Sequence, residues 1–336
     1  MKSEEVKKQR SKEAKKRREV RGVRTVKYKL GERIAERGCV LALGFFDGVH
    51  IGHRELLDFT VKEAARRGVP SAVFTFAYGG GIKSSSAPIY SEREREELFA
   101  SLGIEISIVA DFSELRGLSP EEFVRDVIIE DVGASLAVVG YNYRFGQMGA
   151  GDREKLTSIM QGYEREVKVF DELTLDGREV SSTAIRALLE AGDVREARRL
   201  LSVPYFLTGT VVHGRKDGRK FGYPTINIPM REGSVRLRRG VYLTAVKIGE
   251  KLYTGLTNVG ECPSFGAREY HTESFLSDFA GDAYGMETKV YFLDFIRDER
   301  VFSSAEELGE QIEKDRQRAE KIKGEIKWQE LGQSLR

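Results

Sequence analysis

The chain of 336 residues is too long for one ordinary domain and long enough for two, each with a core of its own. Its 40% hydrophobic residues, 32% charged residues and 35 glycines are typical of a globular protein with many tight turns, which excludes a mostly disordered chain. The longest apolar run, CVLALGFF, is far shorter than the roughly 20 residues that cross a bilayer, and two cysteines cannot form a disulfide framework. We therefore expect a cytoplasmic protein without a membrane anchor.

Residues 1–24 form a basic tail. They contain 11 Lys or Arg and 4 Glu, a net charge of +7, whereas the whole chain carries +2. The rest of the chain is therefore mildly acidic. A disordered segment or a frayed, solvated helix is the simpler interpretation of such a run. The alternative is that the tail binds RNA or another acidic surface through counterion release, and we expect no other contact with nucleic acid.

From Val40 onward, short apolar runs alternate with amphipathic segments. The run VLALGFF precedes a helix predicted from about Gly52 to Arg67, and SAVFTF, ISIVADF and LAVVG follow as further strands. Helices are also predicted around SEREREELFASLG and from Ser119, where Pro120 suits the first helical position. This alternation predicts an α/β domain whose parallel sheet is covered by helices.

The pattern changes after Pro204. Two short helices, separated by Gly192 and Asp193, are predicted before it. Beyond it, short β-branched or aromatic runs such as GVYLTAVKIG and TKVYFLDFI predict an antiparallel barrel or sandwich. A charged amphipathic helix that begins near Ser304 follows these strands. The expected domains are an α/β domain over 25–187, a helical linker over 188–204 and a β domain with its helix over 205–325.

Two of the four histidines lie three residues apart in GFFDGVHIGHREL, between a predicted strand and a predicted helix. Open parallel sheets bind ligands at such turns, and the free N–H groups of a helix N-terminus favour anions. His50 and His53 share a helix face, so both can contact one polyphosphate. Gly52 between them lets a nucleotide approach the backbone. Two ordinary surface histidines are the alternative, whereas a metal site would need further ligands that the nearby sequence lacks.

Two further segments follow this motif, VVGYNYRFGQMGAGD and then SSTAIR. Together the three resemble the N-terminal half of the bacterial bifunctional riboflavin kinase and FMN adenylyltransferase family, the FAD synthetase family. The resemblance implies a Rossmann-like nucleotidyltransferase domain that adenylylates FMN with ATP and releases pyrophosphate. It implies catalytic roles for His50 and His53. The nucleotide-binding residues that it implies are Gly44, Phe46, Asp47, Gly52, Asn142, Arg144, Phe145, Gly146, Ser181, Ser182, Thr183 and Arg186.

The string GTVVHGRKDGRKFGYPTINIP fails as a phosphate loop, because Arg215 and Lys216 stand where lysine and a hydroxyl residue are required. It resembles the riboflavin kinase domain of the same family, and GVYLTAVKIG, TNVG and FLDFIRDERVF follow in the family's order. The resemblance implies an antiparallel β-barrel that phosphorylates riboflavin, with Glu273 as the catalytic base. It implies ATP binding by Gly214, Gly218, Gly222, Pro224, Thr225 and Asn227, Mg²⁺ binding by Thr225 and Asn227, and flavin binding by Asp278, Phe279, Tyr284 and Arg297.

One segment departs from the family. A Pro-His-Pro element usually stands where this chain reads FTFAYGGGIKSSSAP, with glycines from Gly79 to Gly81. If that segment holds FMN, flavin affinity at the adenylyl site is reduced while the phosphate chemistry is not. The main prediction is an enzyme that takes Mg-ATP, riboflavin and FMN. The alternatives are a kinase with an impaired adenylyl site, and a flavin-sensing or RNA-binding regulator that uses the basic tail. The sequence contains no signal that favours one oligomeric state over another.

Overall fold

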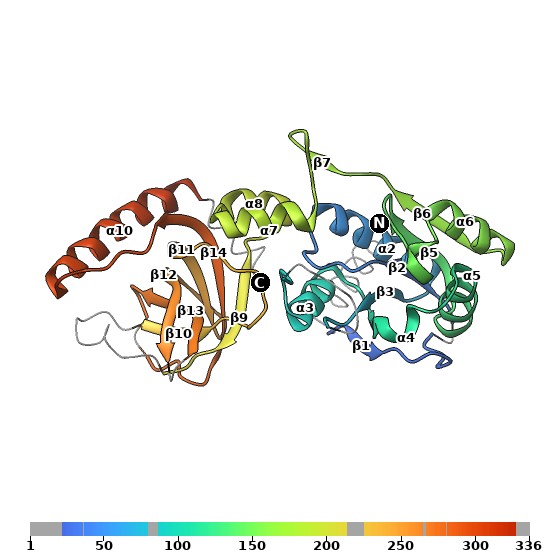
Figure 1. The fold of residues 1–336 in the computed structure, drawn as a ribbon, viewed down its shortest axis with the longest axis horizontal. Coiled ribbons are helices and arrows are strands. Elements are labelled where there is room, and N and C mark those ends of the chain that lie inside the picture. Colours follow the sequence, from blue (N-terminus) through green and yellow to red (C-terminus); the bar gives the residue numbers. More distant parts are fainter. Residues whose placement is uncertain are drawn as a thin grey trace, which may run out of the picture. The chain divides into compact units, whose positions relative to one another are not determined.

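The computed structural model describes residues 22–35, 37–79, 87–213, 225–264, 267–279 and 281–326, without the side chains of 262–269 and of residue 305. The chain divides into two units: residues 1–85 with 90–180, and residues 86–89 with 181–336. Figure 1 colours the first unit blue to green and most of the second yellow to red. Nearly all of the predicted basic tail lies outside the described residues.

The first unit contains a six-stranded sheet in the order β1-β4-β3-β2-β5-β6. Every neighbouring pair in it is parallel, which confirms the predicted α/β fold. The central strand β2 is completely buried. Its apolar residues pack against helices on both sides of the sheet. The strands are β1 Arg24–Lys27, β2 Cys39–Leu43, β3 Ser71–Phe76, β4 Ile106–Ala110, β5 Ala134–Gly140 and β6 Glu166–Phe170.

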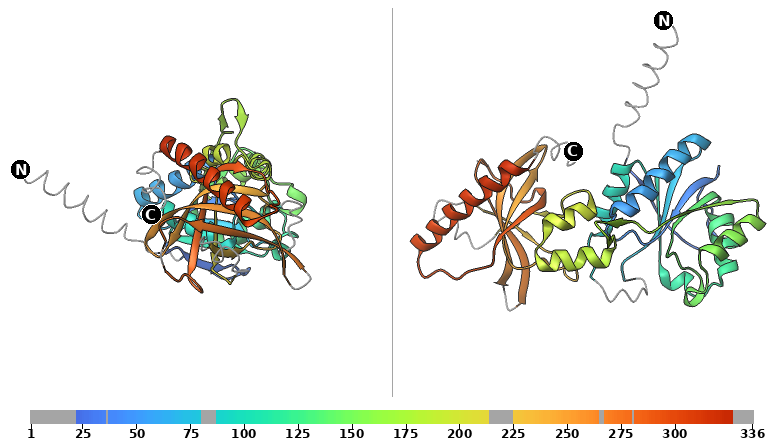
Figure 2. Two further views of the ribbon diagram at one scale, coloured as in Figure 1. Left: turned by 90° about the vertical axis from the view of Figure 1, so that its left-hand side faces the viewer. Right: turned by 90° about the horizontal axis from the view of Figure 1, so that it is seen from above.

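Helices cover this sheet in two groups, which lie on opposite faces (Figure 2). Helices α2 and α3 contact each other, and α5, η1 and α6 contact one another. The first group is α2 Ile51–Arg67 and α3 Glu92–Leu102, and the second includes α5 Pro120–Glu122, the π-helix η1 Phe123–Asp131 and α6 Arg153–Gly162. The described part of the unit also contains short elements: α4 Phe112–Leu115, η2 Gln147–Gly149, β7 Thr174–Leu175 and β8 Arg178–Glu179.

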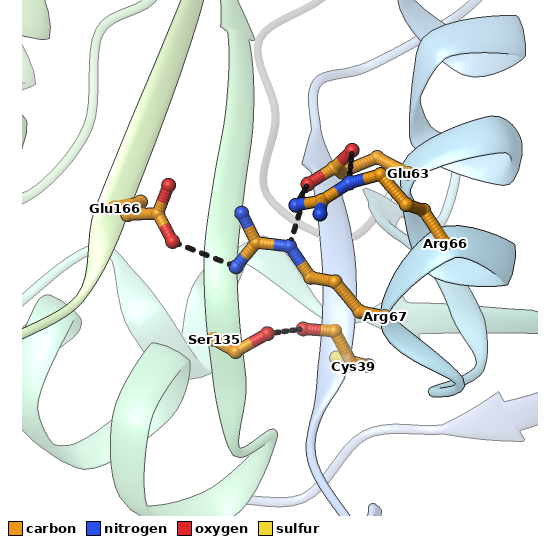
Figure 3. Close-up of polar contacts among 6 residues, drawn as sticks. All are labelled: Cys39, Glu63, Arg66, Arg67, Ser135 and Glu166. Carbon is orange, nitrogen blue, oxygen red and sulfur yellow. Dashed lines mark hydrogen bonds and ion pairs between the residues drawn. The ribbon is translucent and has the colours of Figure 1, made fainter.

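Serine residues cap two of the helix starts, and the first of them, Ser119, was predicted. Ser119 caps α5, and Pro120 occupies its first turn. Ser91 forms a capping box with Glu94 at α3. The last turn of α2 is tied to the sheet, because Arg67 forms ion pairs with Glu63 and with Glu166 of β6 (Figure 3). The Arg67 contacts fix the C-terminal end of the helix that carries the histidine motif.

The strand order creates a topological switch point at β2. From β2 the chain continues outward through β3 and β4 on one side, and later through β5 and β6 on the other. The connections that leave the carboxyl ends of β2 and β5 therefore diverge, and open α/β sheets bind ligands in the crevice that such a divergence creates. The histidine motif follows β2, and the GYNYRFG motif follows β5. The fold thus directs both motifs to one edge of the sheet.

The second unit is built on an antiparallel sheet in the order β10-β13-β12-β11-β14-β9. Its first and last strands approach each other, since Val212 after β9 forms a bridge with Asn227 of β10 and nearly closes a barrel. Gly209 allows this approach, because a Cβ there would lie 2.3 Å from Cγ2 of Ile228. The predicted barrel is confirmed. Its strands are β9 Phe206–Thr210, β10 Thr225–Pro229, β11 Gly240–Ile248, β12 Lys251–Ser264, β13 Ala267–Leu276 and β14 Glu287–Arg297.

Among its described residues, the second unit contains the helices α7 Ser182–Ala191, α8 Val194–Leu201 and α10 Ala305–Glu325. Gly192 and Asp193 separate α7 from α8, as predicted, and α8 packs against β14. Ser304 caps α10, which packs on the outer side of β12 and β14. The predicted linker 188–204 thus consists mainly of helices that the structure groups with the barrel.

Candidate active sites

The histidine pair lies at the start of α2. His50 is the N-cap residue, and its Nδ1 accepts a hydrogen bond of 3.3 Å from the His53 backbone N–H. The two imidazole rings stack with their centroids 3.6 Å apart. Because Nδ1 of His50 is an acceptor, the proton of the neutral ring lies on Nε2. The pair therefore presents N–H donors beside the free backbone amides of a helix of 17 residues.

Burial keeps both imidazoles uncharged. It lowers the pKa of His50 from 6.5 to about 4. It also lowers the pKa of His53 well below its usual range, and the neighbouring His50 lowers it further. Nδ1 of His53 is buried and has no hydrogen-bond partner in the described part of the chain. Near pH 7 the ligand-free pair is therefore neutral and carries unused hydrogen-bonding capacity.

The loop before the histidines has a strained backbone. Phe46 and Val49 have positive φ angles of 52° and 43°, which are unfavourable for bulky side chains. The strain places the Phe46 ring edge-to-face with His53, at a centroid distance of 5.1 Å. The packing also explains Gly44, because a Cβ there would lie 2.9 Å from the Phe46 ring. Gly52 is less constrained, since a Cβ added there would lie 3.5 Å from the His50 ring, which is an ordinary van der Waals distance.

Arg95 of α3 anchors this loop, although its sequence context gave no indication of a role. Its side chain is 1% exposed and donates hydrogen bonds to the carbonyl oxygens of Phe45 and Phe76, at 2.8 and 2.9 Å. Its guanidinium also lies over the Tyr78 ring. The Tyr78 hydroxyl in turn donates to the buried carboxylate of Asp47, at 2.6 Å. The predicted residues Phe46 and Asp47 are therefore held within a loop of fixed shape.

The GYNYRFG segment follows β5 at the same edge of the sheet. Its residues have different surroundings. Phe145 is a core residue that packs on Phe123, whereas Arg144 is largely exposed and pairs with Asp152 at 3.6 Å. Gly146 has a φ of 72°, and a Cβ there would lie 2.8 Å from the Pro120 nitrogen. Gly146 and Phe145 thus shape the loop, while Asn142 and Arg144 are its polar members.

The SSTAIR segment opens the second unit. Ser181 is the N-cap of α7, and its side chain accepts a hydrogen bond from the Ala184 N–H. Ser182 and Thr183 occupy the first turn of that helix. Arg186 donates through Nε to the Ala87 carbonyl oxygen at 2.7 Å. The nucleotide-binding role of these four residues stays a prediction.

In the second unit, Glu273 lies at the centre of a polar row. Across the antiparallel ladders its direct neighbours are Asn227 of β10 and Asn258 of β12. Directly paired residues point to the same face of a sheet, so the three side chains lie side by side. The Glu273 carboxylate accepts a hydrogen bond of 2.6 Å from the Thr225 hydroxyl. The structure thus brings together Thr225, Asn227 and Glu273, three of the residues that the family resemblance assigns to the kinase site.

A pocket of about 270 Å³ lies beside this row, between the outer face of the barrel and α10. Thr225, Asn258 and Glu273 form its polar side, and Arg297 forms another part of its wall. Its apolar side is suited to a flat aromatic ring, because it is lined by aliphatic and aromatic side chains. These apolar residues are Val241, Leu256, Phe275, Phe302, Leu308 and Ile312.

Arg297 is locked in this wall by α10. Its guanidinium forms a two-pronged ion pair with Asp315, with nitrogen–oxygen distances of 2.8 to 2.9 Å. Asp315 is 4% exposed and also accepts from Gln311 at 2.8 Å. A half-buried arginine whose guanidinium is held by a two-pronged ion pair keeps one orientation. Among the four predicted flavin-binding residues, Arg297 is the one that lines the pocket.

The other predicted flavin residues lie in the turn after β13. The Phe279 ring packs edge-to-face on the Tyr253 ring, and the ring centroids of Tyr284 and His213 lie 3.8 Å apart. Asp278 is exposed. None of the three lines the 270 Å³ pocket. The predicted ATP-binding residues Gly214, Gly218, Gly222 and Pro224 lie outside the described residues, as do Gly80 and Gly81 of the glycine run.

Two family models match the chain, and the boundary between them lies between the parallel sheet and the antiparallel sheet. Residues 32–184 match the family model of FAD synthetase, and residues 201–323 match that of riboflavin kinase. A bifunctional riboflavin kinase/FMN adenylyltransferase from Bacillus subtilis is 34% identical over 83% of this chain and 91% of its own length. The chain belongs to this bifunctional family. The resemblance inferred from the sequence motifs is confirmed.

Other relatives agree with this assignment. The bifunctional riboflavin kinase/FMN adenylyltransferase of Pseudomonas fluorescens is 36% identical, over 84% of this chain and 92% of that protein. A crystal structure described as a macrolide-efflux protein from Streptococcus pneumoniae superposes with a TM-score of 0.79 and 31% identity. That match covers 88% of this chain and 98% of the other. In the described part of this family member, no helix has the length and apolar composition needed to cross a membrane.

Several pocket residues of this riboflavin kinase/FMN adenylyltransferase family member were not predicted from its sequence. Asn258 belongs to the TNVG segment, and the pairing of β12 with β13 would have placed it beside Glu273. Leu308, Ile312 and Asp315 recur at three- and four-residue intervals along α10, a spacing that places them on one helix face. The period was visible in the sequence, but the surface against which that face packs was not.

Proposed function

We propose that this chain phosphorylates riboflavin to FMN and adenylylates FMN to FAD, with ATP bound at two separate sites. The observation that carries the proposal is the presence of two polar centres, one in each unit. The His50–His53 pair lies at the switch point of the parallel sheet, and the Thr225–Glu273 pair borders the pocket of the barrel. Each centre lies within a segment that matches the corresponding family model.

In the adenylyl transfer, an oxygen of the FMN phosphate attacks the α-phosphorus of ATP. The bond from that phosphorus to the oxygen bridging to the β-phosphate breaks, and pyrophosphate leaves. No covalent enzyme intermediate is required, so the protein positions the two anions and stabilises the charge that develops on the phosphates. His50 and His53 donate to those oxygens. Asn142 and Arg144 of the first unit hold the nucleotide. The family resemblance also assigns Ser181, Ser182, Thr183 and Arg186 to nucleotide binding.

In the kinase reaction, the terminal ribityl hydroxyl of riboflavin attacks the γ-phosphorus of ATP, and ADP leaves. The loose transition state of phosphoryl transfer requires the hydroxyl to be in line with the γ-phosphate more than it requires early deprotonation. The Glu273 carboxylate orients this hydroxyl and accepts its proton late. Asn227 and Asn258 flank the carboxylate on either side and restrict its position.

The residues beside Glu273 suit a magnesium ion. Mg²⁺ prefers oxygen ligands and is usually held by a few protein oxygens together with substrate phosphates and water. The Thr225 hydroxyl and the Asn227 amide oxygen supply two such groups in one row. When bound there, Mg²⁺ would neutralise charge on the ATP phosphates. The described residues hold no cluster of three His, Cys, Asp or Glu for a metal, so the substrate phosphates would complete this coordination.

We assign the adenylyl reaction to residues 25–187 and the kinase reaction to residues 205–325, with the helices of 188–204 between them. A cytoplasmic location is part of the same proposal, because both reactions consume ATP. The decisive experiment incubates the purified protein with riboflavin and Mg-ATP and separates the flavins by chromatography. Both FMN and FAD should form. FMN alone would identify a kinase with an impaired adenylyl site, and neither product would favour a flavin-sensing regulator.

Asp315 should affect riboflavin binding through Arg297. The Asp315→Asn substitution leaves the Arg297 guanidinium without its charged partner, so the pocket wall loses its fixed orientation. We expect the KM for riboflavin to rise at least about tenfold, equivalent to about 1.4 kcal/mol, with a smaller change in the KM for ATP. Steady-state kinetics measure both. Glu313→Gln on the same helix is the control, because its pair with Arg316 is half-exposed and should contribute little. Equal effects of the two variants would contradict this role.

The basic tail should be dispensable for both reactions. Its charge is opposite to that of the rest of the chain, and no predicted site residue lies within it. Deletion of residues 1–24 should change neither turnover rate by more than about tenfold, or about 1.4 kcal/mol of barrier. Both assays on the truncated protein check this. A larger loss in either assay would show that the tail contributes to that site.

A further inference from the structure

Arg54 is a half-buried cation without a counter-ion. In the described structure its guanidinium forms no hydrogen bond and no ion pair, and its Nε is among the buried nitrogens that have no partner. Burial lowers the pKa of Arg54, and the nearby Tyr90 and Asp58 only partly oppose this effect. The two terminal nitrogens of the guanidinium are not among these fully buried atoms, so an anion can reach them and offset the cost of partly burying the charge. The missing partner therefore points to a ligand.

The position of Arg54 places this cation at the adenylyl site. Arg54 directly follows His53, in the first turns of α2. It lies seven residues before Val61, and residues seven apart share a helix face. Val61 faces the C-terminal end of α3, because its Cγ1 lies 3.5 Å from the Cβ position of Gly103. Arg54 thus lies on the flank of α2 that faces α3, two turns nearer the ligand-binding edge of the sheet.

The N-terminus of α3 lies on the same side. Tyr90, whose electrostatic effect reaches Arg54, immediately precedes Ser91, the N-cap of α3. Helix N-termini carry partial positive charge. The Arg54 guanidinium is therefore close to two positive helix ends, those of α2 with 17 residues and α3 with 11.

The nearby carboxylates do not compensate this charge. Glu94 accepts from Ser91 in the capping box of α3, and Asp47 accepts from the Tyr78 hydroxyl. Asp58, one turn further along α2, attracts Arg54 but forms no ion pair with it. A guanidinium, two helix N-termini and no paired carboxylate make a site for a doubly charged anion. A phosphate suits it, because its oxygens can accept two parallel hydrogen bonds from the guanidinium fork.

We propose that Arg54 binds a phosphate group of the adenylyl-transfer substrates, next to the phosphates that His50 and His53 contact. The inference rests on the proposed FMN adenylyltransferase function. The phosphate can belong to FMN or to the part of ATP that leaves as pyrophosphate. In either case the guanidinium would contact a substrate, and the substrate would supply the counter-ion that the protein lacks.

The test compares Arg54→Gln and Arg54→Lys with Arg66→Gln. Arg66 lies on the same helix but pairs with Glu63 far from the N-terminus (Figure 3). The measured quantities are the KM for FMN and for ATP in FAD formation, and the affinity for inorganic pyrophosphate by calorimetry. Riboflavin phosphorylation by the same samples reports correct folding. It should be retained, because Arg54 forms no ion pair or hydrogen bond within the described protein that Arg54→Gln would break.

Arg54→Gln should raise at least one KM by about tenfold or more, and Arg54→Lys should restore part of the loss. A rise in the KM for FMN alone assigns the FMN phosphate. A rise in the KM for ATP, together with weaker pyrophosphate binding, assigns the leaving phosphates. The inference is wrong if Arg54→Gln matches Arg66→Gln in all three quantities.

Failure of the proposed function would look different. In that case the wild-type protein would form no FAD from FMN. The pyrophosphate titration then tests phosphate binding by Arg54 independently, since a binding measurement requires no turnover. Weaker binding by Arg54→Gln than by Arg66→Gln would support a phosphate site without the reaction, and equal binding would overturn the inference.

Discussion

Replacement of Glu273 by Gln should abolish FMN formation from riboflavin and leave FAD formation from supplied FMN unchanged. The amide has nearly the shape of the carboxylate but cannot take up the proton of the attacking hydroxyl. Loss of a general base typically costs about 100- to 10,000-fold in rate. The hydrogen bond from the Thr225 hydroxyl can still form, because the amide oxygen is an acceptor. The fold of the barrel should therefore survive.

Each variant is assayed twice, once with riboflavin and once with FMN as the starting flavin, after circular dichroism confirms folding. Glu250→Gln, an exposed carboxylate in the turn between β11 and β12, is the control for a lost negative charge on the same barrel. Glu273→Asp keeps the charge but shortens the side chain, so it should retain more activity than Glu273→Gln. Kinase activity of Glu273→Gln within about tenfold of wild type would exclude Glu273 as the base.

The His53→Ala variant should show the reverse pattern, with slow FAD formation and normal riboflavin phosphorylation. The substitution removes a hydrogen-bond donor aimed at the phosphates, and loss of one such donor costs about 100- to 1000-fold in rate. His53 also contacts the rings of His50 and Phe46, so part of the effect would come from a less ordered loop.

A second substitution separates these two contributions. His53→Gln keeps a donor of similar reach but lacks the aromatic ring, so it isolates the packing contribution. Thermal unfolding of both variants measures the stability of the loop's surroundings. If His53→Ala slows riboflavin phosphorylation as strongly as FAD formation in a folded protein, the histidine pair does not belong to a separate adenylyl site.

The sequence predicted the central elements of the fold because their signals are local. The buried strand β2, the start of α2 at the histidine motif and the Ser119–Pro120 helix start each follow from neighbouring residues. Strands β1 and β6 were not predicted. They are edge strands, RTVK and EVKVF, whose charged and partly exposed side chains lack the apolar run of a central strand.

The candidate sites were predictable where a motif carries them and not where tertiary packing builds them. Thr225, Asn227 and Glu273 were assigned from motifs, and the strand pairing brings them together. Asn258 joins them only through the register of β12 with β13. Arg95 and Asp315 act on residues that are 50 and 18 positions away in the chain, Phe45 and Arg297, and no sequence period relates such contacts. Their roles follow from the folded structure.

The most direct test of two separate sites is complementation between two inactive variants. Glu273→Gln and His53→Ala are each incubated with riboflavin and Mg-ATP, alone and as an equimolar mixture, and FAD is measured by chromatography. Alone, the first variant should form neither FMN nor FAD, and the second should form FMN with little FAD. The mixture should form FAD, because FMN released by the second variant is adenylylated by the first. Absence of FAD from the mixture, with both variants folded, would contradict two independent sites.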